Sequence, residues 1–177
     1  MPVIPYQPED IQTPAELVAA IRSRRGGKLL NLDRMLLHSP PFAAGWNTFI
    51  GHVRNDLALP DKLSELAICT VAILNGADYE LTQHAPEFLK AGGTRDQLAA
   101  LSDVTLPTFQ KALFNRIEQV VIQLTIEMTG MVKVAPATMA AIKQHLQNDQ
   151  HLVELVGVIA TYNMVSRYLV ALEIKGD

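Results

Sequence analysis

Apolar residues recur at every third or fourth position along most of this chain, which is the spacing of helices that bury one face. Proline, glycine and asparagine separate the periodic stretches. The expected helices cover approximately residues 13–25, 31–38, 42–57, 61–75, 78–91, 94–101, 106–129, 136–148 and 149–174. The strict alternation typical of a half-buried strand does not occur. The sequence therefore predicts an all-α fold, a multi-helical bundle of about eight or nine helices.

Three helix starts carry specific signals. Thr13-Pro14-Ala15-Glu16 and Thr94-Arg95-Asp96-Gln97 each place a threonine three residues before a glutamate or glutamine, the pattern of a capping box. Leu106-Pro107-Thr108 is expected to begin the long helix that ends near Thr129, because proline suits the first helical turn.

Composition and charge narrow the class of protein. The chain has 177 residues, 49% of them hydrophobic, and a formal net charge of −3. These values argue against disorder and against a basic nucleic-acid-binding surface. No apolar run reaches transmembrane length, and the N-terminus lacks the pattern of a signal peptide. We expect a cytoplasmic protein with no nucleic-acid or membrane partner, with residues 1–12 as an extended arm and residues 13–177 as a single helical domain.

The stretch 64–85 differs from the rest of the chain. It predicts two helices that meet at Asn75-Gly76, the first almost wholly apolar apart from Glu65. A carboxylate on a buried helix needs a partner, and His84 on the second helix is the candidate. The pair is interpreted either as a proton-transfer site, in which the acid orients the histidine, or as a structural link between two helices.

Further polar residues surround this pair in the sequence. Glu80 lies one turn before His84 on the same helix face, either as a second carboxylate of the site or as an exposed neighbour. Tyr79 and Gln83 form the adjacent stripe and either contact a ligand or lie at a rim. The last predicted helix places Asn163, Ser166 and Arg167 near one face, with Tyr162 beside Ser166.

Metal and thiol chemistry have little support. No pair of histidines or carboxylates has convincing metal-ligand spacing, and no glycine-rich phosphate loop is present. The single cysteine, Cys69, excludes an intramolecular disulfide and a cysteine zinc cluster. It follows Glu65 by one turn on an apolar helix, where a cysteine is usually an inert small hydrophobe. No cofactor is expected.

The central stretch resembles a known family. Residues 63–68, Asn75-Gly76-Ala77-Asp78-Tyr79-Glu80 and His84, followed by Ala91-Gly92-Gly93 and a short helix at 94–101, are similar to the carboxymuconolactone decarboxylase family, which includes the alkyl hydroperoxidase D-like (AhpD-like) proteins. The resemblance implies an all-helical fold and a homo-oligomer, a trimer, dimer or hexamer, with sites near subunit contacts.

The peroxidase branch of that family adds a specific comparison. There, a glutamate is followed by Cys-x-x-Cys-x-x-x-His. Glu65 and His84 match the glutamate and the histidine, but the two cysteine positions fall on Ala77 and Glu80. Dithiol reduction of peroxides requires both thiols. The resemblance therefore implies a CxxC-lacking member without peroxidase activity of that type.

The resulting hypothesis is a cofactor-free lyase or proton-transfer enzyme acting on a small organic acid or lactone. His84 would donate the proton, and Glu65 would orient the His84 side chain. The substrate would be bound by Glu80, Tyr79 and Gln83. The alternative is a non-catalytic helical oligomer that binds a small molecule. A peroxidase-like redox protein is the weaker alternative, since it would rest on Cys69 alone.

Overall fold

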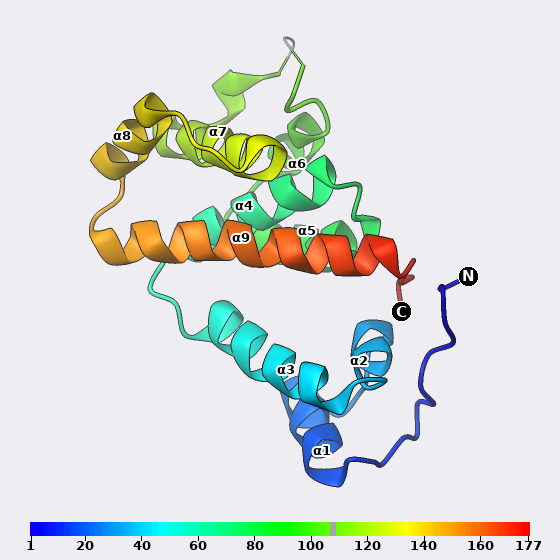
Figure 1. Ribbon diagram of the computed structural model, residues 1–177. Helices are drawn as coiled ribbons and strands as arrows, with labels where there is room; N and C mark the ends of the chain where they lie inside the picture. Colours follow the sequence, from blue (N-terminus) through cyan, green and yellow to red (C-terminus); the bar gives the residue numbers. More distant parts are fainter. Residues whose placement is uncertain (107–108) are drawn as a thin grey trace. The chain divides into compact units, whose positions relative to one another are not determined.

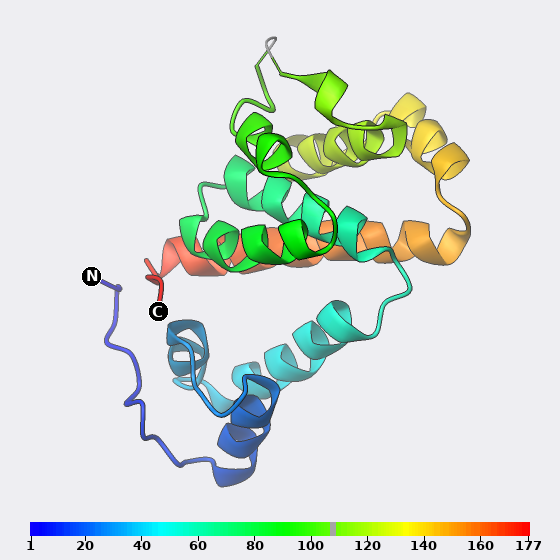
Figure 2. The same ribbon diagram turned by 180° about the vertical axis from the view of Figure 1, so that it is seen from behind.

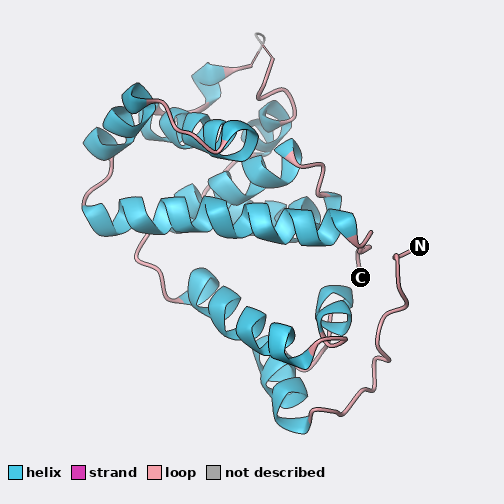
Figure 3. Ribbon diagram, viewed as in Figure 1, coloured by secondary structure: helices cyan, strands magenta, loops and turns pink. Residues whose placement is uncertain are grey.

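The computed structural model describes residues 1–106 and 109–177. In this part of the chain it contains nine α-helices, a short 3-10 helix and no strand (Figures 1 and 3). The predicted all-α fold of eight or nine helices is confirmed. The helices are α1 Ala15–Arg24, α2 Asn31–Leu36, α3 Pro40–Asn55, α4 Asp61–Leu74, α5 Asp78–Lys90, α6 Arg95–Leu101, η1 Lys111–Leu113, α7 Arg116–Met131, α8 Pro136–His145 and α9 Asp149–Ala171.

The chain divides into two compact units. Unit 1 comprises Met1–Leu57 with Leu169–Asp177, and unit 2 comprises Ala58–Tyr168. The single domain expected over residues 13–177 stays a prediction. None of the described helices combines the length and the apolar character needed to cross a lipid bilayer.

Helix α4 is the centre of unit 2. It packs against both α5 and α7, and α7 packs against α8; Figure 2 shows these helices from behind. Most of α4 is buried, including Leu66, Ala67 and Val71, which are fully inaccessible to solvent. Each large apolar side chain buried in this way contributes about 1.5–3 kcal/mol relative to an exposed one. The apolar pattern of this stretch thus reflects burial on all sides.

Local capping decides where α6 begins. The Thr94 side chain accepts a hydrogen bond from the Gln97 amide, and the Gln97 side chain accepts one from the Thr94 amide, each at 3.1 Å. The capping box predicted here is confirmed. The one predicted at Thr13 is wrong, because Pro14 occupies the N-cap position of α1 and the helix begins one residue later than a threonine cap would require.

The long helix α7 begins later than the sequence pattern suggested. Its N-cap is Asn115, whose side chain accepts from the Glu118 amide at 3.0 Å, while Glu118 Oε2 accepts from the Asn115 amide at 2.9 Å. The expected start at Leu106 is wrong, because Leu106 and residues 109–114 lie before this capping box and outside α7. Residues Lys111–Leu113 form the 3-10 helix η1. Pro107 and Thr108, on which that expectation rested, lie outside the described residues.

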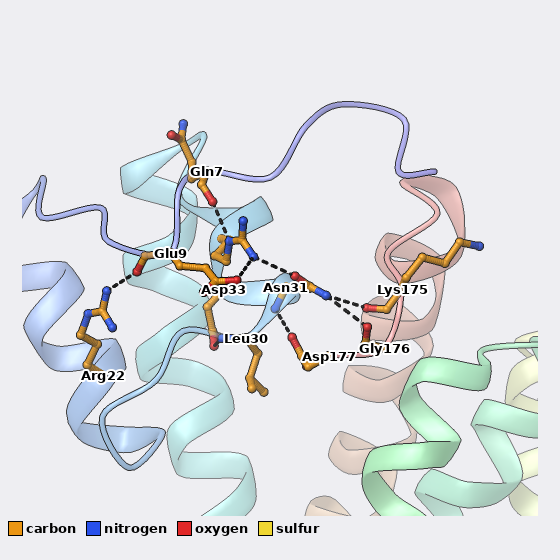
Figure 4. A network of polar contacts seen from close by, with 10 residues as sticks. Gln7, Glu9, Arg22, Leu30, Asn31, Asp33, Lys175, Gly176 and Asp177 are labelled. Atoms are coloured by element: carbon orange, nitrogen blue, oxygen red, sulfur yellow. Dashed lines mark hydrogen bonds and ion pairs between the residues drawn. The ribbon is translucent and has the colours of Figure 1, made fainter.

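In unit 1, the N-terminal arm and the last residues of the chain both bind α2 (Figure 4). Arg34 Nε donates to the Gln7 carbonyl at 2.6 Å. Asn31 Nδ2 donates to the carbonyls of Lys175 and Gly176 at 3.3 and 3.2 Å. Residues 1–12 are non-helical and form hydrogen bonds within their own unit, and their role as an extended arm stays a prediction.

Candidate functional site

Glu65 of α4 and His84 of α5 form a direct hydrogen bond. His84 Nδ1 lies 2.7 Å from Glu65 Oε2, and the two side chains are only 5% and 15% exposed. The chain reverses between the helices at Gly76, whose φ of 63° favours glycine. This reversal places α5 against α4. The pairing proposed from the sequence therefore forms, and the carboxylate has the partner that its buried helix requires.

Tyr162 of α9 fixes the other side of the histidine. Its ring contacts the His84 ring edge-on, with the centroids 4.8 Å apart and the planes at 85°. Tyr162 is 2% exposed. A hydrogen bond from one side and an aromatic contact from another restrict the orientation of the imidazole. Side chains from α4 and α9 thus hold His84 of α5 in place.

Glu80 is the most deeply buried carboxyl group of this cluster. It is 2% exposed, which excludes the exposed alternative considered from the sequence. Its Oε1 accepts a hydrogen bond from Ser166 Oγ of α9 at 2.9 Å, while Oε2 has no hydrogen-bond partner. Burial raises the pKa of Glu80 to about 8, and the Ser166 bond opposes that rise only in part. At neutral pH this side chain is mainly a neutral carboxylic acid.

Cys69 lies among these acids. Its side chain is fully buried, and burial raises the pKa of the thiol to about 12, with Glu65 and Glu80 adding smaller increments. The contribution of both acids shows that the three groups lie close together. A thiol with this pKa carries almost no thiolate at neutral pH, and the thiolate is the nucleophilic form.

Tyr79 and Gln83 are the two other residues that the sequence predicted to bind substrate. Tyr79 is 8% exposed and Gln83 is half-buried, both on α5. Within the described part of the chain, the Gln83 side chain makes no hydrogen bond. The structure therefore brings Glu65, His84 and Glu80 together and leaves the substrate-binding role of Tyr79 and Gln83 a prediction.

Helix α9 supplies the residues that sequence reasoning left without a role. Besides Tyr162 and Ser166, it contributes Asn163, which accepts from Asn75 Nδ2 at 3.2 Å and from Arg167 Nη1 at 2.7 Å. The only sequence signal was their shared helix face. That periodicity identifies a face but not the helix that it meets.

No group of three or more histidine, cysteine, aspartate or glutamate side chains is arranged to hold a metal ion within residues 1–106 and 109–177. A separate cleft of about 410 Å³ lies elsewhere in unit 2, between α7, α8 and the side chains of Val104, Leu106 and Phe109. Its lining includes Lys111, Arg116 and Gln119, but neither Glu65 nor His84. The polar cluster at His84 and this cleft are distinct features.

One known protein family matches part of this sequence. The profile of the Carboxymuconolactone decarboxylase family matches residues 40–121. The match covers 82 of the 177 residues of the chain. The matched region contains Glu65, Cys69, Glu80 and His84, whereas Tyr162 and Ser166 lie beyond it. A comparison with curated proteins gave no match.

Several solved structures share the fold. An uncharacterized peroxidase-related protein from Silicibacter sp. TM1040 superposes with a TM-score of 0.76 at 14% identity, covering 96% of this chain and 88% of that one. A second such protein, the alkylhydroperoxidase AhpD core from Ralstonia eutropha JMP134, gives 0.72 at 13% identity, covering 92% and 84%. The chain thus has an AhpD-like fold.

The debrominase Bmp8 also shares this fold. Its cysteine-to-alanine variant, solved in complex with 2,3,4-tribromopyrrole, superposes with a TM-score of 0.77 at 10% identity, covering 100% of this chain and 94% of that one. At such identities the likeness concerns the fold alone.

Proposed function

We propose that this protein is a proton-transfer enzyme that acts without a cofactor on a small organic acid or lactone, with His84 as the proton donor and acceptor. The observation that carries the proposal is the 2.7 Å hydrogen bond between Glu65 and His84 in a nearly dry setting. Histidine is the side chain best suited to exchange protons near neutral pH. The family name, decarboxylase, supports the same reaction class.

We assign the tautomer of His84 from its partner, because an ionised carboxylate only accepts hydrogen bonds. Nδ1–H then donates to Glu65, and Nε2 is the nitrogen that would exchange a proton with the substrate. The carboxylate fixes this tautomer and stabilises the imidazolium that forms when Nε2 takes up a proton. The edge-on contact with Tyr162 would hold the ring plane while the proton moves.

The proposed chemistry is complete without an electron acceptor. In a decarboxylation, the bond from the substrate carbon to its carboxylate breaks, and carbon dioxide leaves. The electron pair remains on a conjugated carbonyl group of the substrate as an enolate. His84 then donates its proton to the carbon, which restores the carbonyl group. In an isomerisation, the same residue removes a proton from one carbon and returns it to another.

The neutral state of Glu80 is compatible with an acidic substrate. An ionised carboxylate one turn from His84 would repel an anionic ligand. Because burial raises the pKa of Glu80 to about 8, this group carries little charge at neutral pH. Repulsion of an organic acid by a carboxylate at this position is thereby weakened.

A dithiol peroxidase mechanism fits these residues poorly. Ala77 and Glu80 stand where the peroxidase branch is expected to have its cysteines, and Cys69 is the single thiol of the chain. A buried thiol with a pKa of about 12 provides neither the attacking thiolate nor a resolving partner.

The alternative function is that of a non-catalytic helical oligomer in which Glu65–His84 only links α4 to α5. One observation favours it, namely that the pair joins two helices that pack directly on each other. Homo-oligomerisation as a dimer, trimer or hexamer is part of either proposal. Light scattering that gave a monomeric mass would contradict the oligomer.

Deuterium exchange tests the enzymatic proposal because it reports proton transfer whatever product is finally formed. Unsaturated lactone acids such as muconolactone and β-keto acids such as acetoacetate would be incubated in D₂O and followed by NMR. We expect accelerated exchange or carbon dioxide release with the wild-type protein. His84→Gln should lower the rate about 10²- to 10⁴-fold.

The chain provides a matched control for that substitution. His52 also bonds a carboxylate, Asp56 Oδ2, at 2.6 Å, but both side chains are mostly exposed. His52→Gln should leave the rate unchanged. If His84→Gln reacts as fast as the wild type, or if no carbon acid exchanges, the structural alternative replaces the proposal.

A further inference from the structure

The cluster contains two glutamates with different partners. Glu80 and His84 lie one turn apart on the same face of α5. His84 is bonded to Glu65 of α4, whereas Glu80 is bonded to Ser166 of α9. Two carboxyl groups in different environments near one histidine are a common arrangement for separate acid and base roles.

Glu80 has unused hydrogen-bonding capacity. Its Oε1 accepts from Ser166 at 2.9 Å, but its Oε2 is buried and bonds to nothing. Buried polar atoms in folded proteins nearly always have a partner. A buried orphan next to a histidine–carboxylate pair therefore points to a ligand that completes it.

Among the residues that the structure describes, no positively charged group lowers the pKa of Glu80. The groups shown close to it are Cys69 on α4, His84 one turn along its own helix, and Ser166 on α9. Neither lysine nor arginine contributes to its titration, which desolvation dominates. The protonated side chain presents a hydroxyl donor on Oε2 once Oε1 is occupied by Ser166.

We propose that Glu80 is a second catalytic residue, which donates a hydrogen bond from Oε2 to the carbonyl oxygen of the substrate. This inference rests on the proposed function of His84 and deepens it, because it defines the substrate class. The reacting unit is a carbonyl group, a ketone or a lactone, whose neighbouring carbon exchanges a proton or loses carbon dioxide.

The two residues then act on the two ends of the same group. His84 takes a proton from the carbon next to the carbonyl, so that a carbon–hydrogen bond breaks and a nitrogen–hydrogen bond forms. The electron pair moves to the carbonyl oxygen, and the developing enolate accepts the hydrogen bond from Glu80. A neutral donor in a dry site stabilises such an oxyanion more than water does.

Binding of an enolate mimic tests the role of Glu80 without turnover. The probe is 4-nitrophenol, whose phenolate resembles an enolate and whose absorbance reports its ionisation. We expect the wild type to bind the phenolate with affinity that falls as pH rises through about 8, where Glu80 ionises. Glu80→Leu should weaken binding by about tenfold or more, and Glu80→Gln, which keeps a neutral donor, should abolish only the pH dependence.

Ser166 separates a functional role of Glu80 from a structural one. Its hydroxyl stabilises the ionised form of Glu80, so Ser166→Ala should move the fall in phenolate binding to higher pH. Glu127 is the matched control: it is also buried in unit 2, but Gln123, Thr138 and the Ala135 amide occupy its carboxylate. Glu127→Gln should not alter binding or its pH dependence.

The outcomes distinguish the two proposals. If phenolate binding is equal in wild type, Glu80→Leu and Glu80→Gln at every pH, the donor role of Glu80 is wrong even where His84→Gln abolishes exchange. If Glu80 governs binding but no carbon acid reacts, the donor role stands and the enzymatic proposal fails. Infrared spectroscopy tests the protonation of Glu80 in the wild type itself, so it does not depend on the folding of a variant. The wild type should show a protonated-carboxyl band at neutral pH, and this band should be absent from Glu80→Gln. A wild-type spectrum without the band would overturn the inference.

Discussion

Ser166 Oγ of α9 donates a 2.9 Å hydrogen bond to Glu80 Oε1 of α5, across 86 positions of sequence. The bond ties the last helix to the helix that carries His84. It satisfies one oxygen of a carboxyl group that is otherwise desolvated, and the second oxygen remains without a partner. This burial has a consequence for stability, because it links folding to the binding of a proton by Glu80.

Stability should fall as pH rises through the neutral range. The pKa of Glu80 rises from 4.5 to about 8 on folding, so between these values the folded state binds more protons than the unfolded state. The contribution of Glu80 to the free energy of unfolding is fully present below about pH 4.5 and is lost progressively up to about pH 8. Across this window the loss is of the order of a few kcal/mol.

Urea unfolding of the wild type and Glu80→Gln over this pH range measures the effect. The variant should lack the part of the pH dependence that comes from Glu80. Its free energy of unfolding should therefore increase relative to that of the wild type as pH rises. Glu87→Gln, an exposed change on the same helix, serves as the control and should keep the wild-type profile. Parallel profiles for wild type and Glu80→Gln would contradict the linkage.

The Glu65–His84 bond should also contribute to folding. Glu65→Ala leaves a buried imidazole without its acceptor, which should destabilise the protein by about 1–3 kcal/mol. Asp56→Ala removes the acceptor of the exposed His52 and should have little effect, because exposed ion pairs contribute little. The denaturant midpoints of both variants measure these effects. An equal loss of stability in the two variants would mean that burial does not strengthen the Glu65–His84 bond.

The sequence predicted the inner pair because both signals were local. An isolated carboxylate on an apolar helix required a partner, and Asn75-Gly76 indicated that the next helix folds back on it. The helix count and the capping box at Thr94 followed from equally local patterns.

The partner of Glu80 could not be predicted in this way. Periodicity placed Ser166 on a face of α9, but only packing decides that this face meets α5. The burial of Glu80, and hence its neutral state, depends on the same packing. The start of α7 was also missed: the prediction rested on Leu106-Pro107-Thr108, whereas the helix begins at the capping box of Asn115 and Glu118.

Cys69 should be unreactive in the folded protein. Its thiol is fully buried and its pKa is about 12, so little thiolate is available. We expect Ellman's reagent to label it at a rate limited by unfolding, and labelling to become rapid in denaturant. Hydroperoxide turnover with a dithiol reductant should be absent. Rapid labelling of the folded protein, or robust turnover, would restore the redox alternative.

Asn163 should be a major determinant of how α9 is held. Its Nδ2 donates to Thr129 Oγ1 of α7 and to the Ile159 carbonyl, each at 3.0 Å, and its Oδ1 accepts from Asn75 at the end of α4. The residue is 9% exposed, so truncation leaves buried polar groups without partners.

Asn163→Ala should therefore destabilise unit 2 by about 2–3 kcal/mol. Asn55→Ala is the control and should change stability much less, because it removes a single hydrogen bond from an exposed asparagine to the Gly51 carbonyl. Because Tyr162 and Ser166 flank Asn163 on the same helix, looser attachment of α9 should also disturb His84 and Glu80. Histidine NMR resonances would report this directly: a shift of the His84 signals in Asn163→Ala but not in Asn55→Ala is expected. Unchanged His84 signals in a destabilised Asn163→Ala protein would show that the site does not depend on this attachment.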